Sequence, residues 1–464
     1  MATVTSGVEP KLVQGLGLVS ATTLVMGSMI GSGIFIVSAE IARQVGSPGL
    51  LIVVWCVAAA LTLMAALSYG ELAAAMPQAG GQYVYLREAY GPLAAFLFGW
   101  TTFTIIQTGT VAAVAVGFAK FSGLFFPWVG AEHYLLGAGR LGLTTEQLVA
   151  IGVLVTLTAI NTRGLYAGAA VQNTFTIAKV AALALLIGLG FFGRSPAAVS
   201  ANFSDFWGDA SWGWAAIRLT GVAMVGALFS SDAWNNVTFT AGEVRNPSRN
   251  LPLSLGLGVG LVSLLYIGCN FVYLSLLPLD GIQTAPQDRV ATAAASVLFG
   301  SVAVQLMAAA IMISTFGCAN GILLSGARVY YAMARDGLFF RGAARLHPTR
   351  FTPNFALWIQ CAWAVLLTLS GRYNDLLDYV IFAVLLFYML TISSLFVLRR
   401  TRPEMKRPYK AIGYPVVPAA YILLAGVIEF LLLRYKPQYT WPGLALVLLG
   451  VPVYFLWRRS QKTA

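Results

Sequence analysis

Two short stretches of this sequence interrupt long apolar segments with glycines and polar residues. Residues 27–33 hold three glycines and two serines, and each glycine inside a helix costs roughly 1 kcal/mol relative to alanine. Residues 229–236 place Asp232 beside serines and asparagines in another apolar segment. A helix that resumes after a break starts with free amides and a positive dipole end, whereas a helix that stops leaves free carbonyls. Two such breaks can therefore bind an anion and an ammonium group on one small molecule.

Each break also has a purely structural interpretation. Gly27 and Gly31 fit the small-xxx-small pattern by which membrane helices pack closely, and Asp232 could cap the helix that follows it. Two breaks five helices apart favour the binding-site interpretation, because paired discontinuous helices form the substrate site of secondary transporters built from inverted repeats. An α-amino acid, which carries both a carboxylate and an ammonium group, matches both kinds of helix end.

The elements that must position these breaks are membrane helices. The 464 residues are 58% hydrophobic and only 10% charged, with a mean hydropathy of +0.77, which leaves too little polar surface for a water-soluble domain. A span needs about 20 predominantly apolar residues. Twelve such stretches are present, and the eighth is long enough to project beyond the bilayer as a helix. They cover residues 12–39, 44–70, 89–119, 147–162, 164–193, 215–242, 250–279, 290–327, 351–371, 379–398, 411–433 and 437–457.

Topology explains the net charge of +12. With the N-terminus inside, 19 of the 29 lysines and arginines fall on the cytoplasmic side and seven on the opposite side, while three lie in or at the ends of spans. This bias follows the positive-inside rule. Together with attraction to the anionic lipid bilayer, it explains the net positive charge, so nucleic-acid binding is not needed to explain it. We expect a multi-pass protein of the cell (inner) membrane with both termini cytoplasmic. The first span lacks the flanking features of a signal peptide, so we interpret it as a mature helix.

Metal, cofactor and disulfide chemistry are not expected. The four cysteines all fall within apolar spans, where they behave as small hydrophobic residues. The two histidines lie in loops without a second ligand at useful spacing. No span combines a nucleophile, a base and an orienting group, so the chain is not expected to be an enzyme.

Five groups of motifs follow one another along the chain. They are GSGIF at 31–35; YGEL at 69–72 with MP at 76–77 and GGQY at 80–83; VQN at 171–173 followed by Lys179; WN at 234–235 with Glu243 and NPSRNLP at 246–252; and RPE at 402–404 with RP at 407–408. Together they resemble the amino acid/polyamine/organocation (APC) superfamily, and its L-type amino acid transporter family in particular. The resemblance implies an all-α membrane protein of LeuT-like fold, with 12 transmembrane helices and breaks in helices 1 and 6. Its inverted repeats would cover residues 12–200 and 201–400, with helices 11 and 12 in residues 411–460.

The resemblance also implies a substrate site at the two breaks. Amides at the first break would hold the substrate carboxylate, carbonyls at both breaks would hold its amino group, and Phe229 would act as an aromatic lid. Several family members have glycine or a small residue where this chain has Asp232. That carboxylate could favour cationic over neutral substrates, or it could be held by nearby hydroxyls as a helix cap. The expected substrate-binding residues are Met29, Gly31, Ser32, Gly33, Phe229, Ser230, Asp232 and Trp234.

Lys179 lies near the middle of its predicted span, too deep for its side chain to reach either surface easily. It could be an internal pin bonded to carbonyls and hydroxyls. The resemblance implies instead that its amine takes the place of sodium in sodium-coupled LeuT-like transporters, near the first half of helix 1 and beside Ser314 and Thr315 of helix 8. We therefore predict that transport does not require sodium, and Lys179 is also a candidate carrier of a coupling proton.

Other charges near the ends of spans predict a gate and a contact. Glu71 and Arg87 flank one cytoplasmic loop, and Arg245 and Arg249 lie in another. We expect these residues to form either inner-gate ion pairs or simple surface charges. Glu429 lies five residues from Arg434, which favours an ion pair or a subunit contact.

The expected function is secondary active transport of neutral and/or cationic L-amino acids by alternating access, as sodium-independent exchange or proton-coupled uptake. The alternatives are a polyamine or amine antiporter, whose substrate lacks the carboxylate, and a channel or nutrient-sensing receptor that binds without turnover. Eukaryotic members of the family pair with a glycoprotein heavy chain through a cysteine between helices 3 and 4. Residues 126–146 contain no cysteine, so no disulfide-linked heavy chain is expected.

Overall fold

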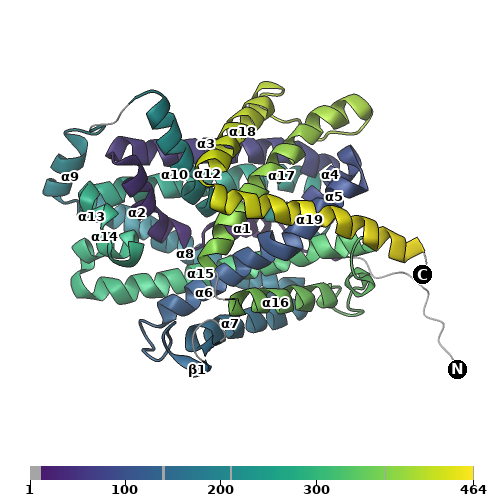
Figure 1. The fold of residues 1–464 in the computed structure, drawn as a ribbon, viewed down its shortest axis with the longest axis horizontal. Coiled ribbons are helices and arrows are strands. Elements are labelled where there is room, and N and C mark those ends of the chain that lie inside the picture. Colours follow the sequence, from purple (N-terminus) through teal and green to yellow (C-terminus); the bar gives the residue numbers. More distant parts are fainter. Residues whose placement is uncertain (1–11, 138–141, 209–211, 371–372, 463–464) are drawn as a thin grey trace.

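Long helices make up nearly all of the chain (Figure 1). The computed structural model describes residues 12–137, 142–208, 212–370 and 373–462. Within these ranges, nine helices are long and apolar enough to cross a membrane, or ten if the bent pair at the N-terminal end counts as one span. The chain is therefore a multi-pass helical membrane protein.

The elements fall into three groups: long apolar helices, shorter apolar helices and small connecting elements. The long helices are α3 (Pro48–Ala75), α5 (Pro92–Thr101) with α6 (Gln107–Ser122), α7 (Thr145–Thr162), α8 (Leu165–Phe192), α12 (Pro247–Leu276), α14 (Val290–Phe299) with α15 (Ala303–Arg335), α17 (Tyr373–Thr401), α18 (Val416–Tyr435) and α19 (Pro437–Lys462). The shorter apolar helices are α1 (Leu18–Met29), α2 (Gly33–Val45), α10 (Trp214–Ser230) and α16 (Asn354–Leu369). The connecting elements are α4 (Gln82–Tyr90), α9 (Pro196–Phe203), α11 (Asn236–Phe239), α13 (Leu279–Gln283) and the antiparallel strands β1 (Tyr134–Leu136) and β2 (Leu143–Thr144), in which Tyr134 lies opposite Thr144.

Each of the twelve predicted apolar stretches overlaps one of these helices or helix pairs. The eighth stretch is interrupted at Gly300, which adopts a φ of 59° and separates α14 from α15. α15 alone has 33 residues, so it is still long enough to project beyond the bilayer, as predicted. A π-helical turn at Thr102–Ile106 between α5 and α6 was not expected. Three basic residues used to predict the topology, Lys11, Arg140 and Arg372, lie outside the described residues.

Local sequence signals explain where several helices begin and end. Ser47 caps α3 by accepting a hydrogen bond from the Leu50 amide, and Pro48 follows at the first helical position. Thr144 and Gln147 form a reciprocal capping box at the start of α7. Gly46 ends α2 in the left-handed conformation (φ 63°) that glycine adopts without steric cost.

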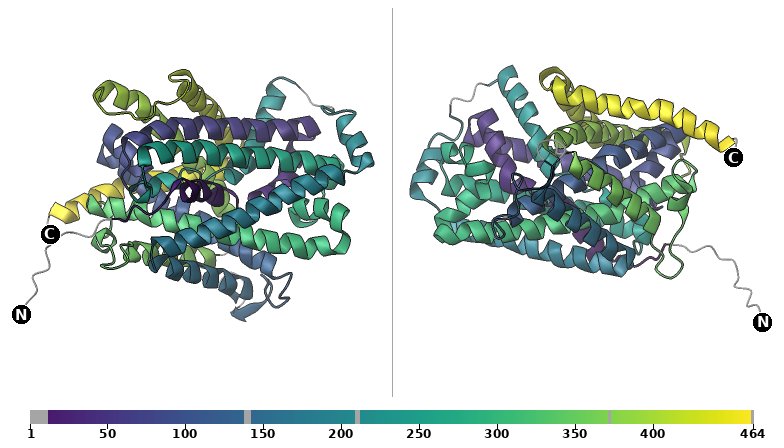
Figure 2. Two further views of the ribbon diagram at one scale, coloured as in Figure 1. Left: turned by 180° about the vertical axis from the view of Figure 1, so that it is seen from behind. Right: turned by 60° about the horizontal axis from the view of Figure 1, so that its bottom comes forward.

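The short helix α1 lies in the middle of the bundle, where it packs against α8, α12 and α15 (Figure 2). Every residue from Thr23 to Met29 is buried. Gly27 permits this close packing, because a Cβ there would overlap the side chains of Gln172 and Thr176 on α8. The first break is therefore surrounded by protein, the setting in which irregular backbone is tolerated at membrane depth.

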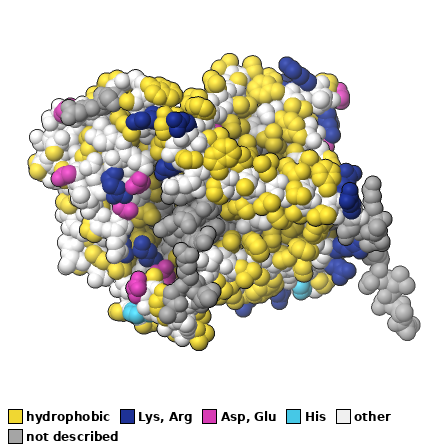
Figure 3. All heavy atoms as spheres, in the orientation of Figure 1, with side chains coloured by type: hydrophobic (Ala, Val, Ile, Leu, Met, Phe, Trp, Pro, Cys, Tyr) yellow, Lys and Arg dark blue, Asp and Glu magenta, His cyan; other side chains and the backbone are white. Residues whose placement is uncertain are grey.

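Hydrophobic side chains cover much of the central surface, whereas lysines and arginines gather toward both ends of the molecule (Figure 3). Many large apolar residues on the outer faces are more than 40% exposed, among them Tyr166, Leu264, Phe430 and Leu456. Such a surface suits contact with lipid tails rather than with water.

Candidate substrate site

The two predicted breaks exist, and they lie against each other in the middle of the bundle. The chain is non-helical between α1 and α2, which are bent by 42°, and between α10 and α11. The start of α2 packs on the end of α10 so closely that a Cβ on Gly33 would lie 2.8 Å from the Cβ of Ser230. Only glycine fits at this contact, which accounts for one of the three glycines of the first motif.

A narrow cavity lies between the breaks. Its empty volume is about 350 Å³. Seven of the eight predicted substrate-binding residues line it, and Trp234 does not. The other five lining residues, which the sequence analysis did not single out, are Ser28, Thr110, Val114, Ala233 and Cys318. The complete lining is Ser28, Met29, Gly31, Ser32, Gly33, Thr110, Val114, Phe229, Ser230, Asp232, Ala233 and Cys318.

The helix that resumes after the first break presents free amides to this cavity. The amides of Ser32 and Gly33 make no backbone hydrogen bond to any described residue, as is usual for the first turn of a helix. The amide of Gly31 instead donates to the carbonyl of Met29 at 2.9 Å. No side-chain cap occupies the start of α2. An anion placed here would meet unpaired donors at the positive end of a helix dipole.

Tyr266 of α12 joins the two breaks, and the sequence analysis missed it. Its hydroxyl lies 2.9 Å from the carbonyl of Ser230 and 3.1 Å from the carbonyl of Met29. The hydroxyl has one proton to share between these two acceptors, and the Met29 carbonyl also accepts the Gly31 amide. The Ser230 carbonyl is therefore the one that keeps a free lone pair for another donor. The buried hydroxyl of Ser28, another lining group, has no hydrogen-bond partner among the described residues. These groups can receive an ammonium ion.

Lys179 lies where the sequence analysis placed it, at the end of α1. Its side chain is only 1% exposed, and its amine donates to the carbonyls of Gly27 and Ile30 at 2.6 Å and of Ser314 at 3.2 Å. The Ser314 hydroxyl bonds the Ile30 carbonyl at 3.0 Å. The hydroxyl of Thr315, by contrast, bonds carbonyls of its own helix. The structure therefore groups Lys179 with Ser314 but not with Thr315.

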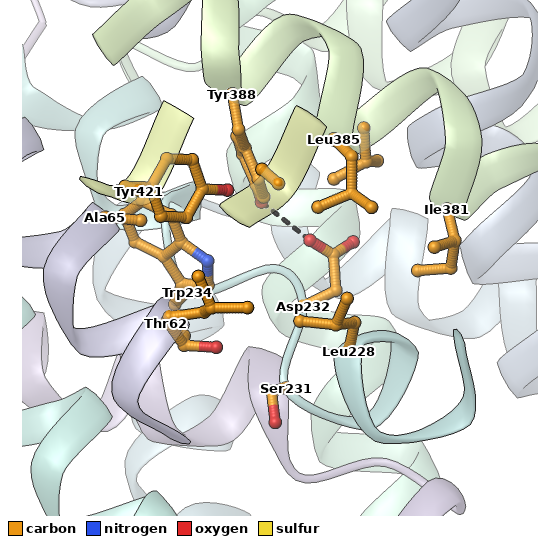
Figure 4. A pocket seen from close by; sticks show the side chains of 13 residues that line it. Thr62, Ala65, Leu228, Ser231, Asp232, Trp234, Ile381, Leu385, Tyr388 and Tyr421 are labelled. Atoms are coloured by element: carbon orange, nitrogen blue, oxygen red, sulfur yellow. Dashed lines mark hydrogen bonds between the residues drawn. The ribbon is translucent and has the colours of Figure 1, made fainter. Parts of the chain in front are cut away.

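Asp232 belongs to a second polar cluster (Figure 4). Its carboxylate accepts a 2.6 Å hydrogen bond from the Tyr388 hydroxyl of α17. It borders the cavity between the breaks and two further cavities, with empty volumes of about 380 and 300 Å³. The structure does not support Asp232 as a helix cap. α11 begins at Asn236, so the N-cap position belongs to Asn235, whose side chain makes no capping hydrogen bond. Trp234 packs edge-on against Tyr69 at 4.8 Å and lines the 380 Å³ cavity.

A buried ion pair joins α15 to the segment that follows α11. Glu243 accepts two hydrogen bonds from Arg328, at 2.8 and 2.9 Å, and both side chains are 1% exposed. Arg328 is one of the 19 basic residues that the topology prediction places on the cytoplasmic side, and the structure buries it in this pair. Next to the pair, Leu16 forms a parallel bridge with Val244: its amide donates to the Glu243 carbonyl at 2.9 Å, and its carbonyl accepts from the Arg245 amide at 2.8 Å. The chain before α1 is thus bound to the chain after α11.

Two of the charges predicted as a gate, Glu71 and Arg87, form ion pairs, whereas Arg245 donates to the main-chain carbonyl of Gln14. Glu71 accepts hydrogen bonds from Arg399 at 2.9 and 2.6 Å and lies 3.3 Å from Arg407. Arg87 pairs with Asp336 at 2.5 Å. These pairs join the ends of α3, α4, α15 and α17, so they link parts of the chain that are far apart in sequence.

The predicted ion pair of Glu429 is absent. This residue of α18 is 6% exposed, and neither carboxylate oxygen has a hydrogen-bond partner among the described residues. Arg434 lies 5.5 Å from the ring of Tyr435 instead.

These observations define the class of the protein: a multi-pass membrane protein in which two broken helices meet around a small polar cavity. The family model for amino acid permeases matches residues 16–454, and the chain belongs to this family. This confirms the resemblance found in the motifs. It also places the chain among transporters and not among enzymes.

Three relatives show how far the similarity extends. The large neutral amino acids transporter small subunit 2 of Homo sapiens is 31% identical over 465 residues, which cover 96% of this chain and 81% of that protein. The Asc-type amino acid transporter 1 of Mus musculus is 30% identical, with 96% and 82% coverage. The b(0,+)-type amino acid transporter 1 of Homo sapiens is 32% identical, with 97% and 89% coverage.

Proposed function

We propose that this protein moves amino acids across the cell membrane by alternating access. The observation that carries the proposal is the cavity between the breaks, where unpaired amides of Ser32 and Gly33 lie near the converging carbonyls of Met29 and Ser230. One ligand that carries a carboxylate and an ammonium group on the same carbon satisfies both sets. The printed names of all three relatives contain the words amino acid or amino acids and transporter.

The substrate would be bound as follows. Its carboxylate accepts hydrogen bonds from the free amides of Ser32 and Gly33. Its ammonium group donates to the carbonyls of Met29 and Ser230 and to the hydroxyl of Ser28. Phe229 covers the site. The free volume is small, so the cavity must widen when substrate enters, as alternating access requires.

The architecture we propose has twelve spans in two inverted repeats, residues 12–200 and 201–400, followed by residues 411–460. Counting α1 with α2 and α10 with α11 as single broken spans, and α16 as a full span, gives twelve. The breaks then fall in the first span of each repeat. The positive-inside rule places the α17–α18 connection, which carries Arg399, Arg402 and Arg407, on the cytoplasmic side of the inner membrane together with both termini.

Lys179 supports a mode of transport that does not use sodium. The ammonium group of Lys179 already donates to the carbonyls of Gly27 and Ile30. These carbonyls therefore have a positive partner without a bound metal cation. We propose exchange or proton-coupled uptake, with Ser314 holding the same carbonyl end of α1. Thr315 supports the neighbouring turn of α15.

Asp232 is proposed to select among side chains. Its carboxylate borders three cavities and has one hydrogen-bonding partner on α17, so a lysine-, arginine- or ornithine-like side chain could reach it from the substrate cavity. The substrates proposed are therefore neutral and cationic L-amino acids. Residues 126–146 lack cysteine, and residues 138–141 of that segment are outside the described residues, so the sequence alone supports the absence of a disulfide-linked heavy chain.

The decisive experiment is counterflow into proteoliposomes preloaded with individual amino acids, with and without sodium and a pH gradient. Saturable exchange is expected, and decarboxylated analogues should compete weakly because they leave the amides of Ser32 and Gly33 unpaired. Strong competition by such amines would favour an amine antiporter. Ligand binding without flux would favour a sensing receptor.

A matched pair of glycine variants tests the position of the site. Gly33→Ala should reduce exchange strongly, because the added methyl group meets Ser230. Gly188→Ala on α8 is the control, since nothing lies within 4 Å of its added methyl group. Equal exchange by both variants would contradict the assignment.

A further inference from the structure

A large open cavity lies apart from the substrate site, between α3, α10 and α18. Its empty volume is about 890 Å³, and apolar side chains such as Val57, Ile217 and Val427 dominate its walls. Ile217 is 51% exposed and Val427 39% exposed, so the cavity opens on the lipid-facing surface. Figure 1 shows these three helices side by side along one edge of the bundle.

The length of the cavity matches one leaflet of a bilayer. The lining residues of α10 run from Ala216 to Met224, which is about 12 Å at 1.5 Å per residue. Trp212 and Gly213 extend the wall just before the helix begins. Half of a hydrocarbon core is about 15 Å thick. An extended apolar chain that enters from the membrane surface therefore fits along this groove.

Positive charge stands at the end of the cavity nearest the membrane surface. Arg218 follows the lining residue Ile217, and Arg434 lies one turn beyond the lining residue Leu431. Both guanidinium groups lie against the ring of Tyr435, at 5.6 and 5.5 Å from its centroid. Neither forms an ion pair with an acidic residue in the described part of the chain. Trp212, which is 66% exposed, lines the same end and suits the interfacial zone where membrane proteins place tryptophan.

We propose that this groove binds an anionic phospholipid, with one acyl chain in the cavity and the phosphate between Arg218 and Arg434. Arginine pairs readily with phosphate oxygens, and basic sites beside transmembrane helices bind anionic lipid headgroups. A second copy of the chain is a poorer occupant, because a symmetric contact around this groove would bring the arginines of both copies together. The lipid would bridge α10, which carries the second helix break, and α18.

The test is native mass spectrometry of the purified protein titrated with phosphatidylglycerol or phosphatidylcholine of the same chain length. Each basic residue beside a net anionic headgroup contributes about fivefold. The two arginines together should therefore give about a 25-fold preference for phosphatidylglycerol over phosphatidylcholine, whose choline cancels the charge of the phosphate. Arg218→Gln combined with Arg434→Gln should remove this preference. Arg194→Gln, an exposed arginine elsewhere, is the control and should keep it.

A second variant tests the acyl chain separately from the headgroup. Ile217→Trp should fill the groove and reduce binding of both lipids, whereas Leu261→Trp on the exposed face of α12 should not. The wild-type protein offers a check that needs no variant, since the preference must fall as salt is raised. The proposal is overturned if the double arginine variant keeps the preference, if the wild-type preference is independent of salt, or if Ile217→Trp acts only by dissociating a dimer.

Discussion

Replacing Lys179 by methionine removes the amine but keeps much of the side-chain length. The wild-type amine donates to three main-chain carbonyls. The Ile30 carbonyl would keep the hydroxyl of Ser314 as a donor. The Gly27 carbonyl would lose its donor, because the amide that would bond it in an unbroken helix, that of Gly31, donates to Met29 instead.

The expected effect follows from this count. One buried carbonyl left without a donor costs about 1–3 kcal/mol. Loss of the charge-assisted bonds adds to that cost, while removal of a buried charge offsets part of it. We take the net destabilisation of the first break, in the arrangement that binds substrate, as about 2 kcal/mol. This corresponds to about a 30-fold loss of exchange. Lys179→Met should therefore be folded but nearly inactive.

The assay is counterflow of a labelled amino acid in proteoliposomes, with Lys120→Met at the exposed end of α6 as the control. Wild-type exchange should be unchanged when choline replaces sodium. Lys179→Ala, which empties the amine position, should be partly restored by sodium if the amine stands in a cation site, and should remain inactive if Lys179 is only an internal pin. Exchange by Lys179→Met within threefold of wild type, or wild-type exchange that requires sodium, would refute the reasoning.

Three further outcomes are expected. Asp232→Asn should lower uptake of cationic relative to neutral amino acids by about tenfold or more, since a hydrogen bond between charged groups contributes about 1.5–3 kcal/mol; an unchanged ratio in competition assays would remove the selectivity role. Gly33→Ala should lower thermal stability by about 1–3 kcal/mol through overpacking against Ser230, and a melting temperature equal to that of Gly188→Ala would contradict this. Glu429→Leu should raise thermal stability by about 1 kcal/mol or more, because two buried acceptor atoms without donors are removed; a lower melting temperature in detergent would show that Glu429 has a partner in the membrane.

The sequence was sufficient to predict the class of the protein and the location of the breaks. Long apolar stretches identify membrane helices, because the bilayer requires each spanning helix to have about 20 apolar residues in one continuous segment. This requirement can be recognised without knowing how the helices pack. Glycines and polar residues within such stretches are equally local signals. For this reason seven of the eight expected substrate-binding residues line one cavity.

The tertiary structure decided how distant helices meet. The bridge from Tyr266 to both breaks and the buried pair of Arg328 with Glu243 depend on the rotation and depth of helices that are far apart in the chain. Sequence spacing suggested a partner for Glu429 on its own helix, but Arg434 lies against the ring of Tyr435, and the Glu429 carboxylate has no hydrogen-bond partner among the described residues. Local composition thus determined that this protein is a membrane bundle with two broken helices, and only packing among the helices determined which donors and acceptors surround the breaks.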